Sequence, residues 1–220
     1  MKGTEIELPH GWSPRDYQAE LWRYLEGGGL RADVAAHRRW GKDDVALNWT
    51  AVSAVQKPGV YWHLLPESAQ GRKAIWEAVN PHTGKRRIDE AFPPQIRSAT
   101  RDGDMSIRLA NGAVWQVLGS DNYDSLVGAP PVGVVFSEWA LAKPEAWTYI
   151  RPILAENGGW ALFLWTPRGR NHAVRAFEAR ARDGAWFTQR SPATETGVFT
   201  PAQLARERAE LVAETGSKEE

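Results

Sequence analysis

The sequence of 220 residues contains no cysteine and has no excess of either charge. The absence of cysteine excludes disulfide frameworks and metal sites built from thiolates. Lysine and arginine together number 27, as do aspartate and glutamate, so the formal net charge is zero. This balance excludes a uniformly basic DNA-coating protein and an acidic tail, although a local basic patch remains compatible with it.

The chain also lacks a long hydrophobic run. No stretch of about eighteen apolar residues occurs, so we expect no helix that crosses a membrane, and the first twelve residues do not have the apolar segment of a secretory signal. The five histidines are not spaced as a pair of zinc ligands. With 42% hydrophobic and 25% charged residues, the composition is that of a globular protein.

Apolar runs alternate with helical patterns along the sequence. The runs at residues 32–36, 60–65, 132–136 and 160–165 are short and almost continuous, which is typical of buried strands. Between the first two runs, Val45 and Val55 bound a stretch with helical spacing. This alternation predicts an α/β fold with a mainly parallel central sheet that is flanked by helices.

Three further helices and a hairpin are expected. The first helix begins near residue 14 with Ser13 as its N-cap and ends at Gly27. The second runs from about residue 66 to 79, and the third begins near residue 144 and is bent or stopped by Pro152. Asn111-Gly112 lies between alternating residues and predicts a β-hairpin over 105–117.

The remaining segments define the expected organisation of the chain. The polar, proline-rich stretch 80–94 is interpreted as a loop that carries the basic residues 85–87. We expect one domain over residues 1–200 and a charged, helical linker over residues 201–220.

The turn after the first strand has features of a phosphate-binding loop. Such a loop needs free backbone N–H groups at a helix N-terminus, a glycine where the phosphate approaches, and a lysine that reaches the β/γ-phosphates. Gly41 and Lys42 meet these needs, but Ala36 and Asp43 occupy the positions of the first glycine and the final Ser/Thr of the usual pattern. Taken alone, the pattern is more typical of a solvated basic turn than of a phosphate-binding loop.

Two other strands end in polar residues of the expected kinds. The strand at 132–136 is followed by Ser137 and Glu138, where nucleotide hydrolases place an Mg²⁺ ligand and an acid that polarises water. The strand at 160–165 is followed by Thr166, a hydroxyl suited to sense a γ-phosphate. An exposed acid at the end of a strand is the alternative interpretation of Glu138.

Three segments together resemble a known family. Residues 37–43 (HRRWGKD), 134–140 (VVFSEWA) and 166–172 (TPRGRNH) are similar to the ATPase motifs of large terminase subunits, the motors that package DNA into the heads of tailed phages. The resemblance extends from about residue 12 to 200. It implies a P-loop NTPase fold of the additional-strand, conserved-glutamate (ASCE, RecA-like) type.

The resemblance implies roles for individual residues. Glu138 would be the catalytic acid, and Thr166 and Arg168 would sense the γ-phosphate and couple hydrolysis to movement. The implied ATP-binding residues are Arg15, Gln18, Arg38, Arg39, Gly41, Lys42 and Asp43. An exposed helical glutamine is the alternative for Gln18.

The two residue types that usually hold Mg²⁺ are exchanged in this sequence. A hydroxyl normally follows the loop lysine and an aspartate precedes the catalytic glutamate, whereas here Asp43 follows Lys42 and Ser137 precedes Glu138. We therefore expect Asp43 to be the acidic Mg²⁺ ligand and Ser137 the neutral one. The alternatives are that Asp43 caps the following helix and that Asp44 binds the metal.

Ring motors complete their sites with an arginine from a neighbouring subunit. In the resembled family this arginine lies in a turn before the acid-bearing strand, and the equivalent residues 125–128 contain none. Arg101 is the first candidate for a trans arginine and Arg151 the second. Alternatively, Arg38 or Arg39 acts in cis, and each candidate is also compatible with an ordinary surface charge.

The resemblance implies ATP hydrolysis that drives translocation of double-stranded DNA into a capsid, with Mg²⁺ as cofactor. The expected partners are the portal protein, the small terminase subunit and further copies in a ring, in the cytoplasm of an infected bacterium. Nuclease activity is not expected, because no acidic cluster is visible and 201–220 would lead to a nuclease domain outside this chain. A helicase-like DNA-dependent ATPase and a DNA-binding adaptor with a degenerate P-loop are the alternatives.

Overall fold

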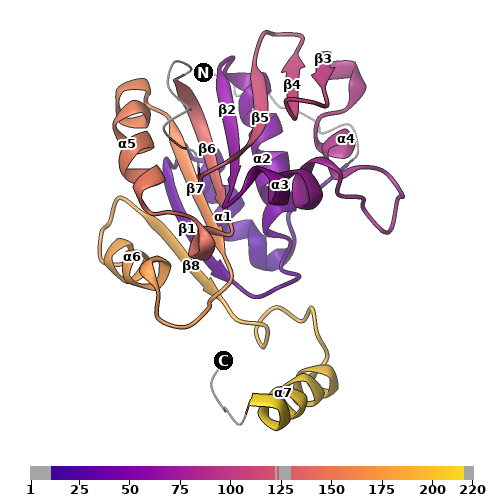
Figure 1. The fold of residues 1–220 in the computed structure, drawn as a ribbon, viewed down its shortest axis with the longest axis vertical. Helices are drawn as coiled ribbons and strands as arrows, with labels where there is room; N and C mark the ends of the chain where they lie inside the picture. The colour runs from indigo at the N-terminus through magenta and orange to yellow at the C-terminus, as the bar shows by residue number, and fades with distance from the viewer. Residues whose placement is uncertain (1–10, 122, 124–129, 216–220) are drawn as a thin grey trace.

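The computed structural model describes residues 11–121, 123 and 130–215, and an eight-stranded sheet forms its centre (Figure 1). The strands stand in the order β3-β4-β5-β2-β6-β7-β1-β8. Their bounds are β1 Arg31–Ala36, β2 Val60–Leu65, β3 Arg97–Arg101, β4 Ser106–Leu109, β5 Val114–Gly119, β6 Pro131–Ser137, β7 Trp160–Trp165 and β8 Phe187–Ser191. Neighbours from β5 to β8 are parallel, whereas β3 and β4 are antiparallel additions at one edge. The predicted mainly parallel sheet and its hairpin are confirmed.

Helices cover both faces of the sheet. Each face has its own apolar core, so the central strands are buried on both sides, as their continuous apolar sequences require. On one side lie α1 (Ala19–Glu26), α2 (Lys42–Gln56) and α4 (Arg87–Ala91), and on the other lie α5 (Glu145–Asn157) and α6 (His172–Arg180) (Figure 1).

Short helical turns and one outlying helix complete the fold. The turns are η1 Asp16–Gln18, α3 Ser68–Gly71, the π-helical η2 Arg72–Trp76, η3 Pro94–Ile96 and η5 Trp139–Leu141. Helix α7 (Pro201–Thr215) stands apart from the sheet (Figure 1), which agrees with the helical stretch expected there. Within the described residues, none of the helices has the length and apolar character needed to cross a membrane.

The strand order determines where the functional segments meet. Strand β7 pairs with β1 on one side and with β6 on the other, and all three run in the same direction. Their carboxyl ends therefore lie side by side, and the segments that follow them, at residues 37–42, 166 and 137–138, share one edge of the sheet. Open α/β sheets bind their ligands at this edge.

The first helix begins later than the sequence pattern predicted. Its first turn is the 3₁₀-helix η1, whose N-cap is Arg15, so the prediction that Ser13 caps a helix from residue 14 is wrong. The side chain of Gln18 accepts a hydrogen bond from the Arg15 backbone N–H at 3.0 Å and thereby fixes the start. The predicted end at Gly27 is confirmed.

The second and third helices also differ from their predictions. The expected helix 66–79 is a short α-helix followed by a π-helical turn and ends at Trp76. Pro152 does not stop α5, which continues to Asn157, because the buried residues Ile150 and Leu154 on either side hold the helix against the sheet.

The stretch 80–94 is not entirely a loop. It contains α4, which begins at Arg87, and the arginines of its basic cluster are engaged within the chain. Arg87 pairs with Asp44 at 2.8 Å, and Arg86 pairs with Asp89 at 2.9 Å. Strands β3 and β8 and helix α6 had not been predicted, since their short and mostly half-exposed sequences lack a clear period.

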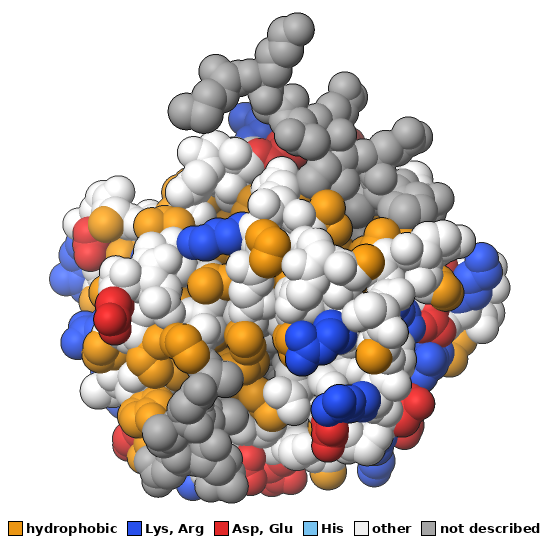
Figure 2. Space-filling view, turned by 90° about the horizontal axis from the view of Figure 1, so that it is seen from above, with side chains coloured by type: hydrophobic (Ala, Val, Ile, Leu, Met, Phe, Trp, Pro, Cys, Tyr) orange, Lys and Arg blue, Asp and Glu red, His pale blue; other side chains and the backbone are white. Residues whose placement is uncertain are grey.

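Charges of both signs are mixed on the surface. Figure 2 shows lysine and arginine side chains interspersed with acidic and hydrophobic ones on the face seen from above, and neither sign dominates it. The zero net charge therefore does not conceal a single-sign field on this face.

A buried ion pair ties the first strand to α6. Arg180 Nη1 donates to Asp33 Oδ2 at 2.6 Å, and Trp165 Nε1 donates to Asp33 Oδ1 at 2.7 Å. The guanidinium lies 3.9 Å from the ring centre of Phe163 and 4.2 Å from that of Trp186. The attraction between the two charges therefore compensates for their removal from water.

We expect Arg180→Met to lower the free energy of unfolding by about 3–5 kcal/mol, because it leaves the Asp33 carboxylate buried without its counter-charge. Urea unfolding monitored by circular dichroism measures the loss. Arg175→Met, at an exposed position of the same helix, is the matched control and should have little effect. Equal stabilities of the two variants would contradict the assignment.

Candidate active site

A cavity of about 1050 Å³ opens at the carboxyl ends of β1, β6 and β7. It is large enough for a nucleotide-sized ligand. The segments that line it include the turn after β1, the first turns of α2, Glu138 and Thr166. On its rim lie residues 80–82 and 196–198, which come from two distant parts of the chain.

The turn between β1 and α2 has the backbone of an anion-binding loop. Arg39 and Gly41 both have positive φ, of 70° and 86°, and Gly41 is the N-cap of α2. The positive φ of Gly41 favours glycine, and a Cβ atom there would lie 2.9 Å from side-chain nitrogens of both Arg15 and Gln18, so these side-chain ends would have to shift. The free N–H groups at the start of the 15-residue α2 attract negative charge.

Lys42 lies across this loop. Its ammonium donates to the backbone oxygens of Ala36 and His37, at 3.1 and 3.0 Å, and to Thr166 Oγ1 at 3.0 Å. Burial lowers the pKa of Lys42, while the nearby carboxylates of Asp43 and Glu138 oppose that shift. The side chain thus links the ends of β1 and β7 within the cavity.

Asp43 and Ser137, the two residues that appear exchanged in the sequence, are in direct contact. Ser137 Oγ donates to Asp43 Oδ1 at 2.7 Å. His63 Nε2 lies 3.3 Å from the same oxygen. Burial raises the pKa of the Asp43 carboxyl. The hydrogen bonds from His63 and Ser137, together with the electrostatic effects of His63 and Lys42, outweigh burial, so the pKa lies below its usual value. Asp43 is therefore held as a carboxylate.

Glu138 follows β6 in a left-handed conformation, with φ of 52°. This region is uncommon for a residue with a side chain, and such strain is concentrated at functional sites. The residue lines the cavity, and its negative charge acts on Lys42. The turn that begins η5 thus presents the carboxyl group at the edge of the sheet.

Arg15 and Gln18 donate hydrogen bonds to the backbone of the loop. Gln18 is only 1% exposed and donates to the Trp40 oxygen at 2.8 Å, and Arg15 donates to the same oxygen at 3.1 Å. Gln18 is therefore a buried residue and not the exposed helical glutamine of the alternative interpretation. Contact between its amide and a purine would require it to release the loop backbone.

The structure separates the remaining predicted residues into two groups. Arg38 and Arg39 line the cavity, as do Arg15 and Thr166. Arg168 and Arg151 are exposed and are not among the residues that line it. Residues 125–128, which would correspond to the trans-arginine turn, lie outside the described residues.

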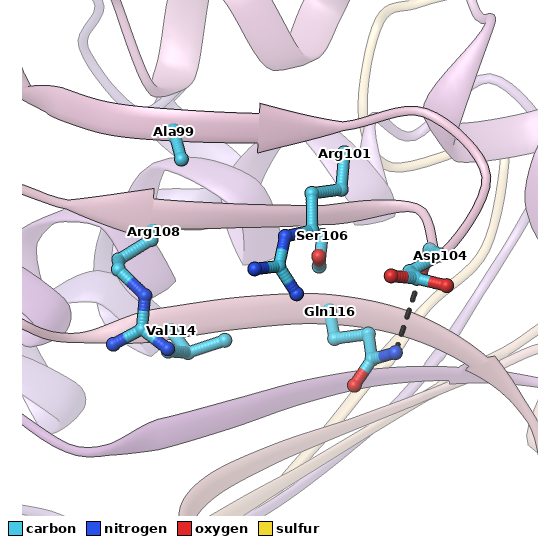
Figure 3. A pocket seen from close by; sticks show the side chains of 7 residues that line it. All are labelled: Ala99, Arg101, Asp104, Ser106, Arg108, Val114 and Gln116. Atoms are coloured by element: carbon cyan, nitrogen blue, oxygen red, sulfur yellow. Dashed lines mark hydrogen bonds between the residues drawn. The ribbon is translucent and has the colours of Figure 1, made fainter.

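Arg101 is the last residue of β3, the strand that directly precedes the β4-β5 hairpin. It shares one exposed face of the β3-β4-β5 extension with Arg108, and the two guanidinium groups extend over β5 into a separate small hollow (Figure 3). Gln116 closes the same hollow by donating to the backbone oxygen of Asp104 at 3.2 Å. Arg101 is thus available to another molecule but does not line the large cavity of its own chain.

Several residues of the site had not been identified from the sequence. His63 was detectable as a lone polar residue in the apolar run 60–65, but its partner Asp43 is 20 positions away. Thr196 reaches the loop through a 2.8 Å hydrogen bond between its Oγ1 and His37 Nε2, and no local pattern marks it. These contacts depend on the order of the strands.

The donor atoms at Asp43 and Ser137 fit a hard divalent cation. Mg²⁺ prefers oxygen ligands, and it is usually bound by one or two carboxylates together with the phosphates of a substrate. Within the described residues, no group of three or more His, Cys, Asp and Glu side chains is placed to hold a metal alone.

Solved structures with a similar fold include the ATPase domain of one phage large terminase and the large terminase of another. The ATPase domain of the Thermus phage P74-26 large terminase has a TM-score of 0.71 and 18% sequence identity, over 92% of this chain and 89% of that one. The large terminase of a second phage, a thermophilic bacteriophage, has a TM-score of 0.67 and 11% identity, over 90% of this chain and 50% of that one. The complex of that second terminase with ATP-γ-S gives a TM-score of 0.67 at 10% identity, over 89% of this chain and 49% of that one. No protein-family model and no curated protein sequence matches the chain.

The chain therefore has a P-loop NTPase fold. More particularly, its fold is that of the ATPase domains of phage large terminase subunits. The predicted fold class is confirmed, and the resemblance noted from three short motifs is confirmed at the level of the fold.

We expect Asp43→Ala to weaken the binding of Mg-ATP at least about tenfold more than the binding of ATP in EDTA, because a carboxylate ligand acts only through the metal. Fluorescence titration with a labelled nucleotide gives both affinities. Asp44→Ala is the matched control, since that carboxylate pairs with Arg87 and should change the two affinities equally. Equal losses for Asp43→Ala would show that this residue only caps α2.

Proposed function

We propose that this chain is the ATPase domain of a large terminase, which hydrolyses ATP with Mg²⁺ and uses the energy to move double-stranded DNA into a phage capsid. The observation that carries the proposal is the Lys42 contact between the loop and Thr166, in the same cavity as Glu138. A loop lysine, an acid and a hydroxyl are the parts that ATP hydrolysis needs.

The roles follow from where the side chains lie. The N–H groups of the loop and the start of α2 bind the phosphates, and Lys42 exchanges its backbone acceptors for β/γ-phosphate oxygens. Glu138 orients and polarises the attacking water, and Thr166 senses the γ-phosphate through its hydroxyl. Arg38 and Arg39, on the rim of the cavity, neutralise charge on the phosphates.

Asp43 and Ser137 would hold the Mg²⁺ ion, with Asp43 as the acidic ligand. When bound, the ion neutralises the charge that develops on the phosphate oxygens. The contact between these two residues supports the exchange of roles that their order along the sequence suggests. Residues 201–220 would then be the linker towards a nuclease domain.

The remaining parts of the proposal concern partners. A motor of this kind works as a ring on the portal, receives DNA from a small terminase subunit, and acts in the cytoplasm of an infected bacterium. Its DNA contacts go to phosphates and are expected to weaken as salt rises. A protein without turnover in the presence of DNA would be an adaptor, and one that separates DNA strands would be helicase-like.

We expect Glu138→Gln to keep nucleotide affinity within about threefold while lowering the ATPase rate of the assembled motor by about 10²–10⁴, because it removes only the group that activates water. Phosphate release, with and without DNA, measures the rate. Glu145→Gln, an exposed acid in the first turn of α5, is the control and should retain the wild-type rate. Wild-type turnover from Glu138→Gln would contradict the assigned role.

We also expect Arg101 to act on a neighbouring subunit. Arg101→Ala should lower turnover strongly, since trans arginines contribute roughly 10³–10⁵ in related phosphoryl transfers. Mixing Arg101→Ala with Glu138→Gln should restore activity, because the second chain supplies the arginine and the first supplies an intact acid. Arg108→Ala and Arg151→Ala are the comparison variants, and full activity of Arg101→Ala would transfer the role to Arg151 or to Arg38 and Arg39 in cis.

A further inference from the structure

His63 is a polar residue enclosed in an apolar strand. It lies in the middle of β2, it is completely buried, and its neighbours along the strand, Trp62 and Leu64, belong to the core on the opposite face of the sheet. Its own ring points to the α2 side, where it meets the edge of Trp115 at 6.3 Å and 89°. Burying an imidazole costs free energy unless the ring is hydrogen-bonded. The hydrogen-bond partner of His63 is therefore informative about its role.

The contacts of His63 indicate which of its ring nitrogens donates a hydrogen bond. Nε2 faces Asp43 Oδ1 at 3.3 Å, whereas Nδ1 is buried and has no hydrogen-bond partner. Since a carboxylate oxygen only accepts, Nε2 must carry the proton and donate it.

Two donors therefore fix the same oxygen of Asp43. Ser137 comes from β6 and His63 from the adjacent strand β2, and both direct their hydrogen to Oδ1. Within the part of the chain that the structure describes, the second oxygen, Oδ2, receives no hydrogen bond from the protein. A carboxylate held by a single donor can still rotate about its side-chain bonds, and a second donor from another strand restricts that rotation.

We propose that His63 is a positioning residue, which holds Asp43 so that Oδ2 faces the cation of a bound Mg-nucleotide. The proposal rests on the proposed function, in which Asp43 supplies the carboxylate usually placed at the end of the acid-bearing strand. The carboxylate of Asp43 extends from α2 instead of from the end of β6, and the contact with His63 restricts its orientation. Partners of metal ligands in other proteins typically alter metal affinity by 10–100-fold.

The test measures Mg²⁺ affinity and not turnover. A labelled ATP analogue is bound to the full chain, and Mg²⁺ is titrated to find its half-saturating concentration. His63→Phe keeps a planar ring but removes the donor, and it should raise that concentration by about 10-fold or more while leaving affinity in EDTA within about twofold. His63→Gln can still donate an N–H from a similar position, and it should restore at least half of the lost affinity on a logarithmic scale.

Trp115→Phe is the packing control. It alters the ring that His63 contacts without removing the Nε2–H donor, so it should lower thermal stability but keep the Mg²⁺ dependence near that of the wild type. An unchanged half-saturating concentration in His63→Phe, or an equal change in Trp115→Phe, would overturn the proposal. Absence of nucleotide binding by the wild type would overturn the proposed function itself.

A second measurement examines the imidazole of His63 in the wild-type protein directly. In ¹⁵N-histidine NMR spectra, the resonances missing from His63→Gln, or from a His63→Asn spectrum, identify His63, and their shifts report which ring nitrogen carries the proton. We expect a proton on Nε2. A proton on Nδ1 alone would overturn the proposal, because Nε2 could not then donate to Asp43.

Discussion

The parallel pairing of β7 with both β1 and β6 is the constraint on which the rest of the site depends. The carboxyl ends of parallel neighbouring strands lie at the same edge of a sheet. Because β7 lies between β1 and β6, the loop after β1 and the acid after β6 meet at that edge. The hydrogen bond from Lys42 to Thr166 spans the first of these steps. Burial on both faces of the sheet stabilises this order, because its central strands are apolar along their whole length.

The site combines groups whose charges are set by neighbours from other strands. Asp43 is held as a carboxylate by donors on β2 and β6, although burial opposes its charge. Lys42 is partly desolvated, and backbone oxygens of the loop compensate its ammonium. Such preorganised charge is effective in a cavity where little reorganisation is needed. The exchange of aspartate and serine keeps one negative charge at the proposed cation site. That charge is on α2, at Asp43, and the neutral hydroxyl is on β6, at Ser137.

The buried and the exposed parts of the molecule are clearly separated. The central strands and α2 are buried, and the ion pair between Asp33 and Arg180 fastens α6 to the strand that leads into the loop. By contrast, the β3-β4-β5 extension leaves Arg101 and Arg108 on an open face, and α7 projects away from the sheet (Figure 1). Contacts with other molecules are therefore expected to use the extension and the outlying helix, while the chemistry stays at the protected edge.

The buried strands, the loop, the acid after β6 and the fold class could be predicted from the sequence, because each is encoded in a local run of residues such as Gly41-Lys42 or Ser137-Glu138. The exchanged residue types of Asp43 and Ser137 predicted that both serve one cation, and their hydrogen bond places them together. The burial of Gln18 against the loop, the pairing of Arg87 with Asp44 and the contact of His63 with Asp43 became visible only in the folded chain. These contacts join residues 20 or more positions apart, and they are set by strand order and side-chain direction, which no local pattern specifies.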